Sequence, residues 1–345
     1  REPARIKPLE IEVDPSWFSK ENQQPPRQVS RQKEEEIRQQ VATMVAAKVV
    51  GSSKARAHSQ VTLAKKPDGT WRFCIDFRRL NVKTKDDCKW PIPRIDAMLQ
   101  RLGAKKSKYY AILDLTKGYY QAPLAEWCRH LTAFITPDGV YEWMRVAMGL
   151  KGAPSYFQRA MATEVLNDLL YECCEVYLDD IIVFGRTKEE YLANLEKVLK
   201  RLNEFNVTVN PKKCQLGLTE VEYVGHVINR EGVTFSPEKL QKALSIDKPK
   251  TEKQLKSFLG VANYFRDHIQ NHSSIVAPLH ALMLGYSPRR LLNWTPEAET
   301  AFEQIRHRLL HCPKLFWIDD NAPIHLYTDA SKLGVGAYLC QERDI

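Results

Sequence analysis

Several features of secreted and membrane proteins are missing from this sequence of 345 residues. No apolar run approaches the roughly 20 residues that a membrane span needs, and no signal peptide is visible. The eight cysteines contain no C-x-x-C pair, so a zinc site and a disulfide framework are both disfavoured. We therefore expect reduced thiols in an intracellular setting. The cysteines are Cys74, Cys88, Cys128, Cys173, Cys174, Cys214, Cys312 and Cys340.

Acidic residues are fewer than basic residues in this sequence. The formal net charge is +9 and the pI is about 9.0, while the hydrophobic fraction of 43% is ordinary for a globular protein. Because phosphate groups are neutralised by lysine and arginine, this balance points to a nucleic acid as partner. Charge alone leaves open the alternative of a merely basic soluble protein.

The composition and the residue pattern of the sequence change along the chain and predict four segments. Residues 1–33 are rich in proline without sustained periodicity, which indicates an extended arm or linker. Residues 34–235 mix helical patterns with strand hairpins and predict an α+β layer. Residues 236–311 are helical, and residues 312–345 return to strand patterns. The first residue is Arg1 rather than methionine, from which we expect an excised domain, a processed product or a fragment.

Two adjacent acids lie in an unusual place. In Tyr177-Leu178-Asp179-Asp180 the pair is flanked by β-branched and aromatic residues, which predicts the turn of a tight strand hairpin. A further acid, Asp114, ends another apolar run. Carboxylates on rigid strand ends suit two magnesium ions about 4 Å apart, as in phosphoryl transfer. Asp114 and Asp179 are then the bridging ligands and Asp180 the accessory acid; the alternative is that all three are ordinary turn residues.

The resemblance to a known family rests on ordered segments that include both acidic sites. They are residues 71–81, 113–120, 148–158, 177–180, 223–226 and 258–264. These segments resemble the boxes of reverse transcriptases, and the last one resembles the thumb of gypsy-type long-terminal-repeat retrotransposons. The resemblance implies a right-hand polymerase fold of class α+β. Residues 34–235 would form fingers and palm, 236–311 a helical thumb or connection, and 312–345 the first hairpin of a ribonuclease-H-like domain.

The resemblance also implies roles around the acids. Asp114, Asp179 and Asp180 would be catalytic, and the Leu115 carbonyl would help to hold metal. Tyr119 would lie beneath the incoming sugar and exclude a 2′-hydroxyl; the alternative is a core aromatic.

Other positions would contact the nucleotide. Gln158 would lie beside it, unless it is a surface helix residue. Arg72 with Lys66 or Lys65 would hold the triphosphate, since arginine can form two parallel bonds and lysine acts as a point charge. The sequence does not decide between the two lysines, and a solvated turn is the alternative. Lys213 is a candidate proton donor to the leaving pyrophosphate.

Two hairpins complete the resemblance. Tyr223, Val224, Gly225 and His226 resemble the primer grip, and we expect His226 to be structural rather than a ligand. Asp329 matches the first metal-binding acid of a ribonuclease H domain. Because that fold needs further carboxylates downstream, we expect Asp329 to be vestigial and this chain to lack ribonuclease H activity.

The resemblance therefore predicts an RNA-directed and DNA-directed DNA polymerase within a retrotransposon Pol polyprotein. Two Mg²⁺ ions, with Mn²⁺ as a substitute, would be its cofactors. A primed RNA or DNA template, dNTPs, and the protease, ribonuclease H and integrase parts of the polyprotein would be its partners, without a membrane. We expect it inside the cell, in a cytoplasmic virus-like particle and in the nucleus. The alternatives are a silent nucleic-acid-binding remnant and an RNA-dependent RNA polymerase.

Overall fold

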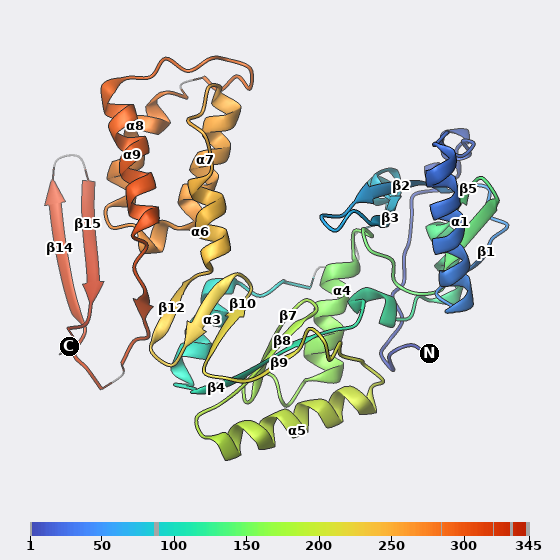
Figure 1. The fold of residues 1–345 in the computed structure, drawn as a ribbon, viewed down its shortest axis with the longest axis horizontal. Helices are drawn as coiled ribbons and strands as arrows, with labels where there is room; N and C mark the ends of the chain where they lie inside the picture. The colour runs from blue at the N-terminus through green and yellow to red at the C-terminus, as the bar shows by residue number, and fades with distance from the viewer. Residues whose placement is uncertain (1, 86–89, 284, 320, 332–333, 343–345) are drawn as a thin grey trace. The chain divides into compact units, whose positions relative to one another are not determined.

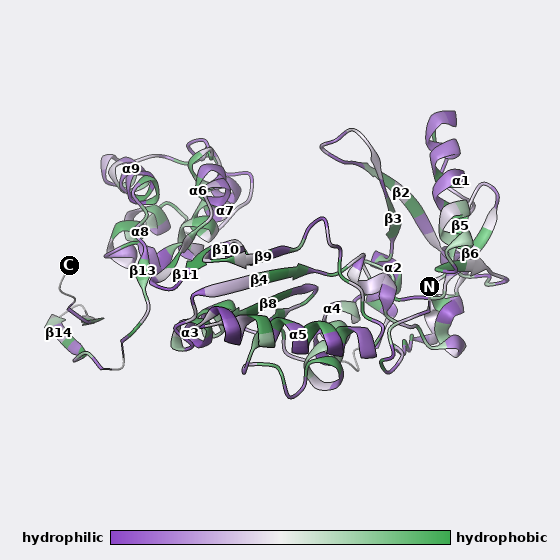
Figure 2. Cartoon of the chain, turned by 60° about the horizontal axis from the view of Figure 1, so that its bottom comes forward, coloured by the Kyte–Doolittle hydropathy of each residue, from purple (hydrophilic) through white to green (hydrophobic). Residues whose placement is uncertain are grey.

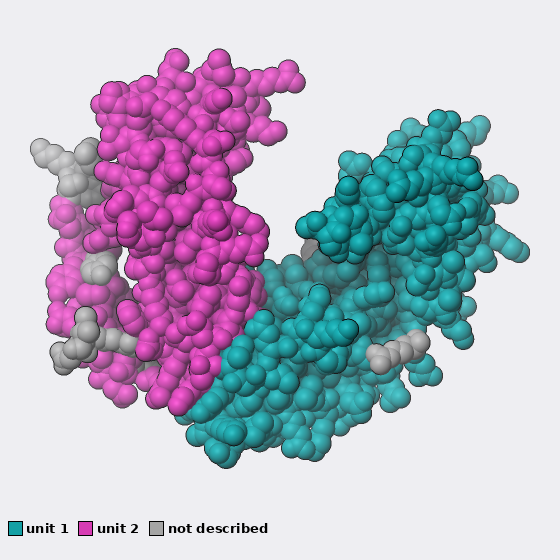
Figure 3. Space-filling model, viewed as in Figure 1, with its two compact units in different colours: residues 1–95, 109–218 teal, residues 96–108, 219–345 magenta. Residues whose placement is uncertain are grey.

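The computed structural model describes residues 2–85, 90–283, 285–319, 321–331 and 334–342. The chain forms two units, which are described separately (Figure 3). The first consists of residues 1–95 and 109–218, and the second of residues 96–108 and 219–345. The second unit therefore begins earlier than the predicted helical segment, because it includes the hairpins of residues 219–235.

A four-stranded antiparallel sheet is the centre of the first unit (Figure 1). Its strands, in spatial order, are β7 (Cys174–Tyr177), β8 (Asp180–Gly185), β4 (Tyr109–Asp114) and β9 (Gln215–Leu218). β8 is hydrophobic along most of its length (Figure 2), as expected for a strand buried on both faces. The helices of this region are α4 (Ala153–Ala160), a π-helical turn (Met161–Val165) and α5 (Lys188–Glu204). Thr187 caps α5, since its side chain accepts from the Glu190 amide.

A second sheet of the first unit carries the basic hairpin. Its strands, in spatial order, are β1 (Val50–Ser52), β6 (Gly139–Trp143), β5 (Phe134–Thr136), β2 (Ser59–Lys65) and β3 (Trp71–Asp76). The accompanying helices are α1 (Arg31–Ala46), α2 (Arg78–Lys83) and the 3₁₀ turns Pro15–Phe18, Lys20–Asn22, Gly118–Gln121 and Glu126–Thr132. β2 and β3 are paired antiparallel and form the basic hairpin that carries Lys65 and Arg72.

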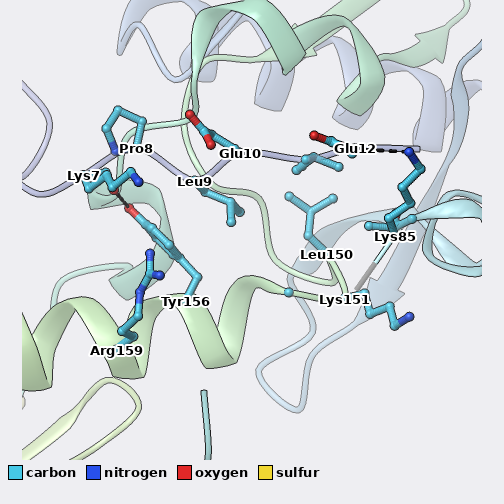
Figure 4. Close-up of a pocket in the computed structure, with 13 residues that line it drawn as sticks. Lys7, Pro8, Leu9, Glu10, Glu12, Lys85, Leu150, Lys151, Tyr156 and Arg159 are labelled. Atoms are coloured by element: carbon cyan, nitrogen blue, oxygen red, sulfur yellow. Dashed lines mark hydrogen bonds and ion pairs between the residues drawn. The ribbon is translucent and has the colours of Figure 1, made fainter. Parts of the chain in front are cut away.

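The N-terminal arm is docked on the first unit rather than being a free linker, and it includes the 3₁₀ turns Pro15–Phe18 and Lys20–Asn22. Leu9 and Trp17 are buried in the core of the first unit, and the Leu9 amide donates to the Pro123 carbonyl at 3.0 Å. A cavity of about 160 Å³ lies beside the arm, and Figure 4 shows residues that line it. Here the Tyr156 hydroxyl donates to the Lys7 carbonyl at 2.8 Å. The arm is thus an integral part of this unit.

The second unit combines a small sheet with helices around a separate core. The sheet is antiparallel, in the order β10 (Glu220–Tyr223), β11 (His226–Asn229), β12 (Gly232–Phe235) and β13 (Leu315–Phe316). The helices are α3 (Ile95–Ala104), α6 (Pro237–Leu244), α7 (Glu252–Tyr264), the 3₁₀ turn Arg266–His268, α8 (His272–Ala281) and α9 (Pro296–Leu310). Thr251 and Gln254 form a capping box at the start of α7. A hairpin of β14 (His325–Ser331) and β15 (Gly334–Cys340) follows.

Two expectations about the chain as a whole can be compared with the structure. Seven cysteines are free thiols, and Cys88 lies outside the described residues. Among the described residues, no helix combines the length and the apolar character that crossing a membrane requires.

Candidate active site

The predicted acidic hairpin is the β7–β8 connection. Tyr177 pairs with Asp180, so Leu178 and Asp179 alone form the turn. Leu178 has a φ of 58°, in the left-handed region that a bulky side chain rarely adopts. Such strain persists only where the surroundings hold it, and it is common at functional sites. The turn therefore requires support from its neighbours.

The strand register brings the three aspartates together. Asp114, the last residue of β4, is directly opposite Asp180, the first residue of β8. The next amide, that of Leu115, donates to the Asp179 carbonyl at 3.4 Å. The Leu115 carbonyl in turn accepts from the Gly118 amide at 3.4 Å, which leaves it one further lone pair. Three carboxylates and one carbonyl thus lie at the same end of the sheet.

The charges at this end are only partly balanced. Burial, together with the negative charges of Asp179 and Asp114, raises the pKa of Asp180 to about 6, whereas Lys213 acts in the opposite direction. The Lys213 ammonium lies 3.3 Å from Asp114 Oδ2 and is largely exposed. Clustered carboxylates with one mobile cation form an environment that favours a bound cation.

The donor set suits a hard divalent ion. Within the described part of the chain, no three His, Cys, Asp or Glu side chains are already arranged around a common metal position. Mg²⁺ does not need such an enclosure, because it binds through one or two carboxylates, water and substrate phosphates. The carboxylates of Asp114 and Asp179, with the Leu115 carbonyl, offer this type of incomplete oxygen shell.

Gly118 fixes the space around Asp179. A Cβ at Gly118 would lie 3.0 Å from Asp179 Cβ and 3.4 Å from Asp179 Oδ2. The neighbouring Tyr119 is half-buried, and its ring packs edge-on against Phe157 at 5.4 Å. Burial, and then the charge of Asp179, raises the pKa of Tyr119 to about 12, so the phenol stays neutral. The sequence motif contained Gly118, but nothing in it revealed this contact.

Gln158 has partners other than those expected. Its side chain is buried, with an exposed fraction of 1%. Its amide nitrogen donates to the Val176 carbonyl at 3.1 Å, and its amide oxygen accepts from the Leu178 amide at 2.7 Å. Both ends of the side chain are therefore bonded to the strained hairpin rather than available to a nucleotide.

The register of the basic hairpin separates the two candidate lysines. Arg72 is opposite Ala64, and Lys65 is opposite Trp71. Because side chains alternate between the faces of a strand, Lys65 and Arg72 lie on opposite faces of the hairpin, and Lys66 follows the last residue of β2. The Lys66 amide donates to the Thr70 carbonyl at 2.8 Å at the start of the turn.

Asn81 is a residue that sequence reasoning missed. Its side-chain nitrogen donates to the Gly149 carbonyl at 2.8 Å, and its oxygen accepts from the Lys151 amide at 2.9 Å. It therefore holds the loop that leads into α4, the helix that carries Gln158. Only its place inside the 71–81 segment could have drawn attention to it.

The remaining predicted residues belong to the second unit. Tyr223 and His226 pair at the ends of β10 and β11, and Val224 and Gly225 form the turn between them. Tyr223 and His226 are buried. Asp329 lies in β14 opposite Gly336, and its side chain is exposed.

Comparisons with known proteins show which family this chain resembles. The family model "Reverse transcriptase (RNA-dependent DNA polymerase)" matches residues 64–228, and "RNase H-like domain found in reverse transcriptase" matches residues 294–345. The retrovirus-related Pol polyproteins of the Drosophila melanogaster transposons 297 and gypsy are each 34% identical, over 89% and 79% of this chain. The transposon Tf2-3 polyprotein of Schizosaccharomyces pombe is 31% identical over 86% of it. The chain spans only 29%, 27% and 22% of these relatives' own lengths.

Solved structures show the same fold over almost the whole chain. A foamy viral protease-reverse transcriptase in complex with double-stranded DNA has a TM-score of 0.83 and 25% identity, over 98% of this chain and 58% of that one. The foamy viral enzyme with an RNA/DNA hybrid has a TM-score of 0.75 and 25% identity, over 98% and 46%. The predicted α+β polymerase fold is thereby confirmed. The chain belongs to the reverse transcriptase family, and it carries the reverse transcriptase domain of a retrotransposon Pol polyprotein.

Proposed function

We propose that this chain extends a primer with dNTPs on RNA and DNA templates by two-metal nucleotidyl transfer. The observation that carries the proposal is the pairing of Asp114 with Asp180 across β4 and β8, with Asp179 at the adjoining turn. Reverse transcriptases generally use divalent metal ions. Here Asp114, Asp179 and the Leu115 carbonyl would hold two Mg²⁺ ions, with Asp180 as accessory acid. Bound there, the ions would supply charge neutralisation and a lowered pKa for the primer hydroxyl.

The neighbouring side chains have separable tasks in this proposal. Tyr119 presents its ring beside Asp179 and excludes a 2′-hydroxyl, so dNTPs are preferred. Gln158 keeps the Leu178 turn in its strained form, and so acts on the acids rather than on the nucleotide. Because the turn already has the required geometry, no free energy is spent on rearranging it at the moment of reaction.

Three basic residues would act on the triphosphate. Lys65 lies on the face of the β2–β3 hairpin opposite to Arg72, so we assign the contact to Lys66 rather than to Lys65. Lys213 is paired with Asp114 in the structure and is largely exposed. Once a cation takes over that carboxylate, the ammonium is free to donate a proton to the departing pyrophosphate.

Nucleic acid is the partner that the similar structures support, since foamy viral enzymes of this fold are described in complex with double-stranded DNA and with an RNA/DNA hybrid. The net charge of +9 agrees with a phosphate backbone as ligand. By analogy with Pol polyproteins, we place the chain beside protease, ribonuclease H and integrase parts, in a cytoplasmic virus-like particle and the nucleus.

One assay tests the activity. The purified chain is given poly(rA)–oligo(dT), Mg²⁺ and either dTTP or UTP, and extension of the primer is measured. We expect extension with dTTP only, and none by Asp179→Asn, which should still bind the duplex. Extension with UTP alone would favour an RNA polymerase, and binding without extension by the unmodified chain would favour a silent remnant.

A further inference from the structure

The turn between β10 and β11 has an unusual backbone. Val224 and Gly225, its two central residues, have φ values of 49° and 75°. Positive φ at both positions is the type I′ geometry that suits a tight hairpin. Glycine adopts it freely, but a β-branched valine does so only at a cost. Neighbouring groups must therefore hold Val224 in place.

Lys239, in the first turn of α6, lies directly on this turn. Its ammonium donates to the Val224 carbonyl at 3.2 Å and to the Tyr264 hydroxyl at 2.8 Å. The same ammonium is 5.0 Å from the centroid of the Tyr264 ring, within reach of a cation–π interaction. A Cβ at Gly225 would lie only 1.8 Å from Lys239 Nζ. The positive φ favours glycine at this position, and an added side chain would have to displace the flexible lysine that covers the turn.

His226 binds the same carbonyl from the other side. Its Nδ1 is 3.2 Å from the Val224 oxygen, and because a carbonyl only accepts, Nδ1 carries the proton. Burial, and then the charge of Lys239, lowers the pKa of His226 to about 4, so the ring is neutral at pH 7. The Ser236 amide donates to the next carbonyl, that of Gly225, at 3.4 Å. Both turn carbonyls are therefore held toward the start of α6.

This arrangement determines where the turn presents its donor. In a planar trans peptide the N–H points opposite to the C=O. The Gly225 N–H therefore points away from Lys239, and it has no hydrogen-bond partner within the described part of the chain. An outward backbone N–H is a common ligand for a nucleic-acid phosphate.

We propose that Lys239 is a positioning residue for the primer strand, and that it fixes the Val224–Gly225 turn so that the Gly225 N–H meets a phosphate near the primer terminus. Tyr264 orients the lysine, and His226 completes the shell of the Val224 carbonyl. The inference rests on the proposed polymerase function. It assigns to a helix residue the control of a hairpin 14 positions earlier in the sequence, counted from Gly225 to Lys239.

The test compares Lys239→Met with Lys242→Met in the full chain. Lys242 is a matched control because it lies one turn further along α6, and its ammonium bonds the exposed Glu238 at 2.6 Å. Single-turnover extension of poly(rA)–oligo(dT) with Mg²⁺ and dTTP gives the maximal rate and the dTTP KM. We expect Lys239→Met to lower the rate about tenfold, with the dTTP KM changed less than about twofold. Tyr264→Phe should lower the maximal rate by a smaller factor. Lys242→Met should lower neither the maximal rate nor the dTTP KM.

Amide hydrogen exchange of residues 223–226 supplies a readout that does not depend on catalysis. Lys239→Met should speed this exchange in the free protein, whereas Lys242→Met should not. If the unmodified chain fails to extend the primer, the polymerase proposal falls while the exchange still reports on the lysine. The positioning role would be overturned if Lys239→Met and Lys242→Met had the same amide exchange or the same extension rate. It would also be overturned if Lys239→Met exchanged faster without any loss of extension rate.

Discussion

At the scale of single residues, the site depends on contacts that leave almost no spare space. Asp179 lies against Gly118, and the turn behind it is held by a glutamine that bonds two backbone groups. Catalytic geometry tolerates little displacement, because a shift of about 1 Å can cost about a hundredfold in rate. Small substitutions around Asp179 should therefore change activity more than stability.

Gly118→Ala tests this contact. Its new Cβ would be 3.0 Å from Asp179 Cβ, closer than ordinary van der Waals contact, so the carboxylate or the 118–121 turn must shift. We expect primer extension to fall at least about tenfold, with the urea midpoint almost unchanged. Gly152→Ala is the control, because a Cβ added at Gly152 would meet no atom within 4 Å and the residue's φ is −83°. Equal activities for the two variants would contradict the assigned packing role.

The lysine assignment gives a second prediction at this scale. Lys65 and Arg72 lie on opposite faces of the hairpin, and Lys66 begins the turn that follows β2. We expect Lys66→Ala and Arg72→Ala each to raise the dTTP KM about tenfold, as befits a lost charge-assisted hydrogen bond. Lys65→Ala serves as the matched control and should change it less than about twofold. A larger effect at Lys65 would mean that the face assignment does not hold in the complex.

At the scale of elements, the N-terminal arm is the segment whose contribution the structure changes most. Trp17 is 1% exposed, whereas the adjacent Phe18 is 48% exposed. Truncating a buried tryptophan typically costs about 3–5 kcal/mol. We expect Trp17→Ala to lower the urea midpoint of the first unit clearly, and Phe18→Ala to lower it by a small fraction of that. Similar midpoints for the two variants would show that the arm is not docked in solution.

The elements also show what could be predicted from the sequence and why. The β7–β8 hairpin was predictable because strand-forming residues flank a pair of acids, and the structure closes it with a two-residue turn. The docking of the arm was not, because Leu9 is paired with residues near 124, more than a hundred positions away, and its apolar residues follow no regular period. Gln158 belongs to the same class, since its role depends on a strand 18–20 residues further on.

At the scale of the whole molecule, the division into units is also a long-range property. α3 belongs with the second unit because Gly103 packs beneath the Trp317 ring, where a Cβ would lie 2.4 Å from a ring carbon. Residues 103 and 317 share no sequence pattern. The residue pattern therefore assigned this helix to the surrounding segment, residues 34–235. Hairpins could be inferred from local sequence patterns. The unit to which a helix belongs depends on long-range packing, which only the fold shows.

The overall charge supports a prediction that concerns the complete chain. If the excess of nine positive charges serves nucleic-acid binding, primer–template affinity must fall steeply with salt, since each phosphate neutralised adds about −0.9 to the slope of log K against log salt for B-form DNA. For about six phosphates, affinity should drop about a thousandfold between 50 and 200 mM salt. Fluorescence anisotropy with a labelled duplex measures this slope. Asp179→Asn should leave it unchanged, because that residue is assigned to chemistry rather than to phosphate contacts along the duplex. If the affinity did not change with salt, the positive charge would be explained by a merely basic protein surface. The electrostatic support for a nucleic-acid partner would then be lost, while the geometry of the three aspartates would be unaffected.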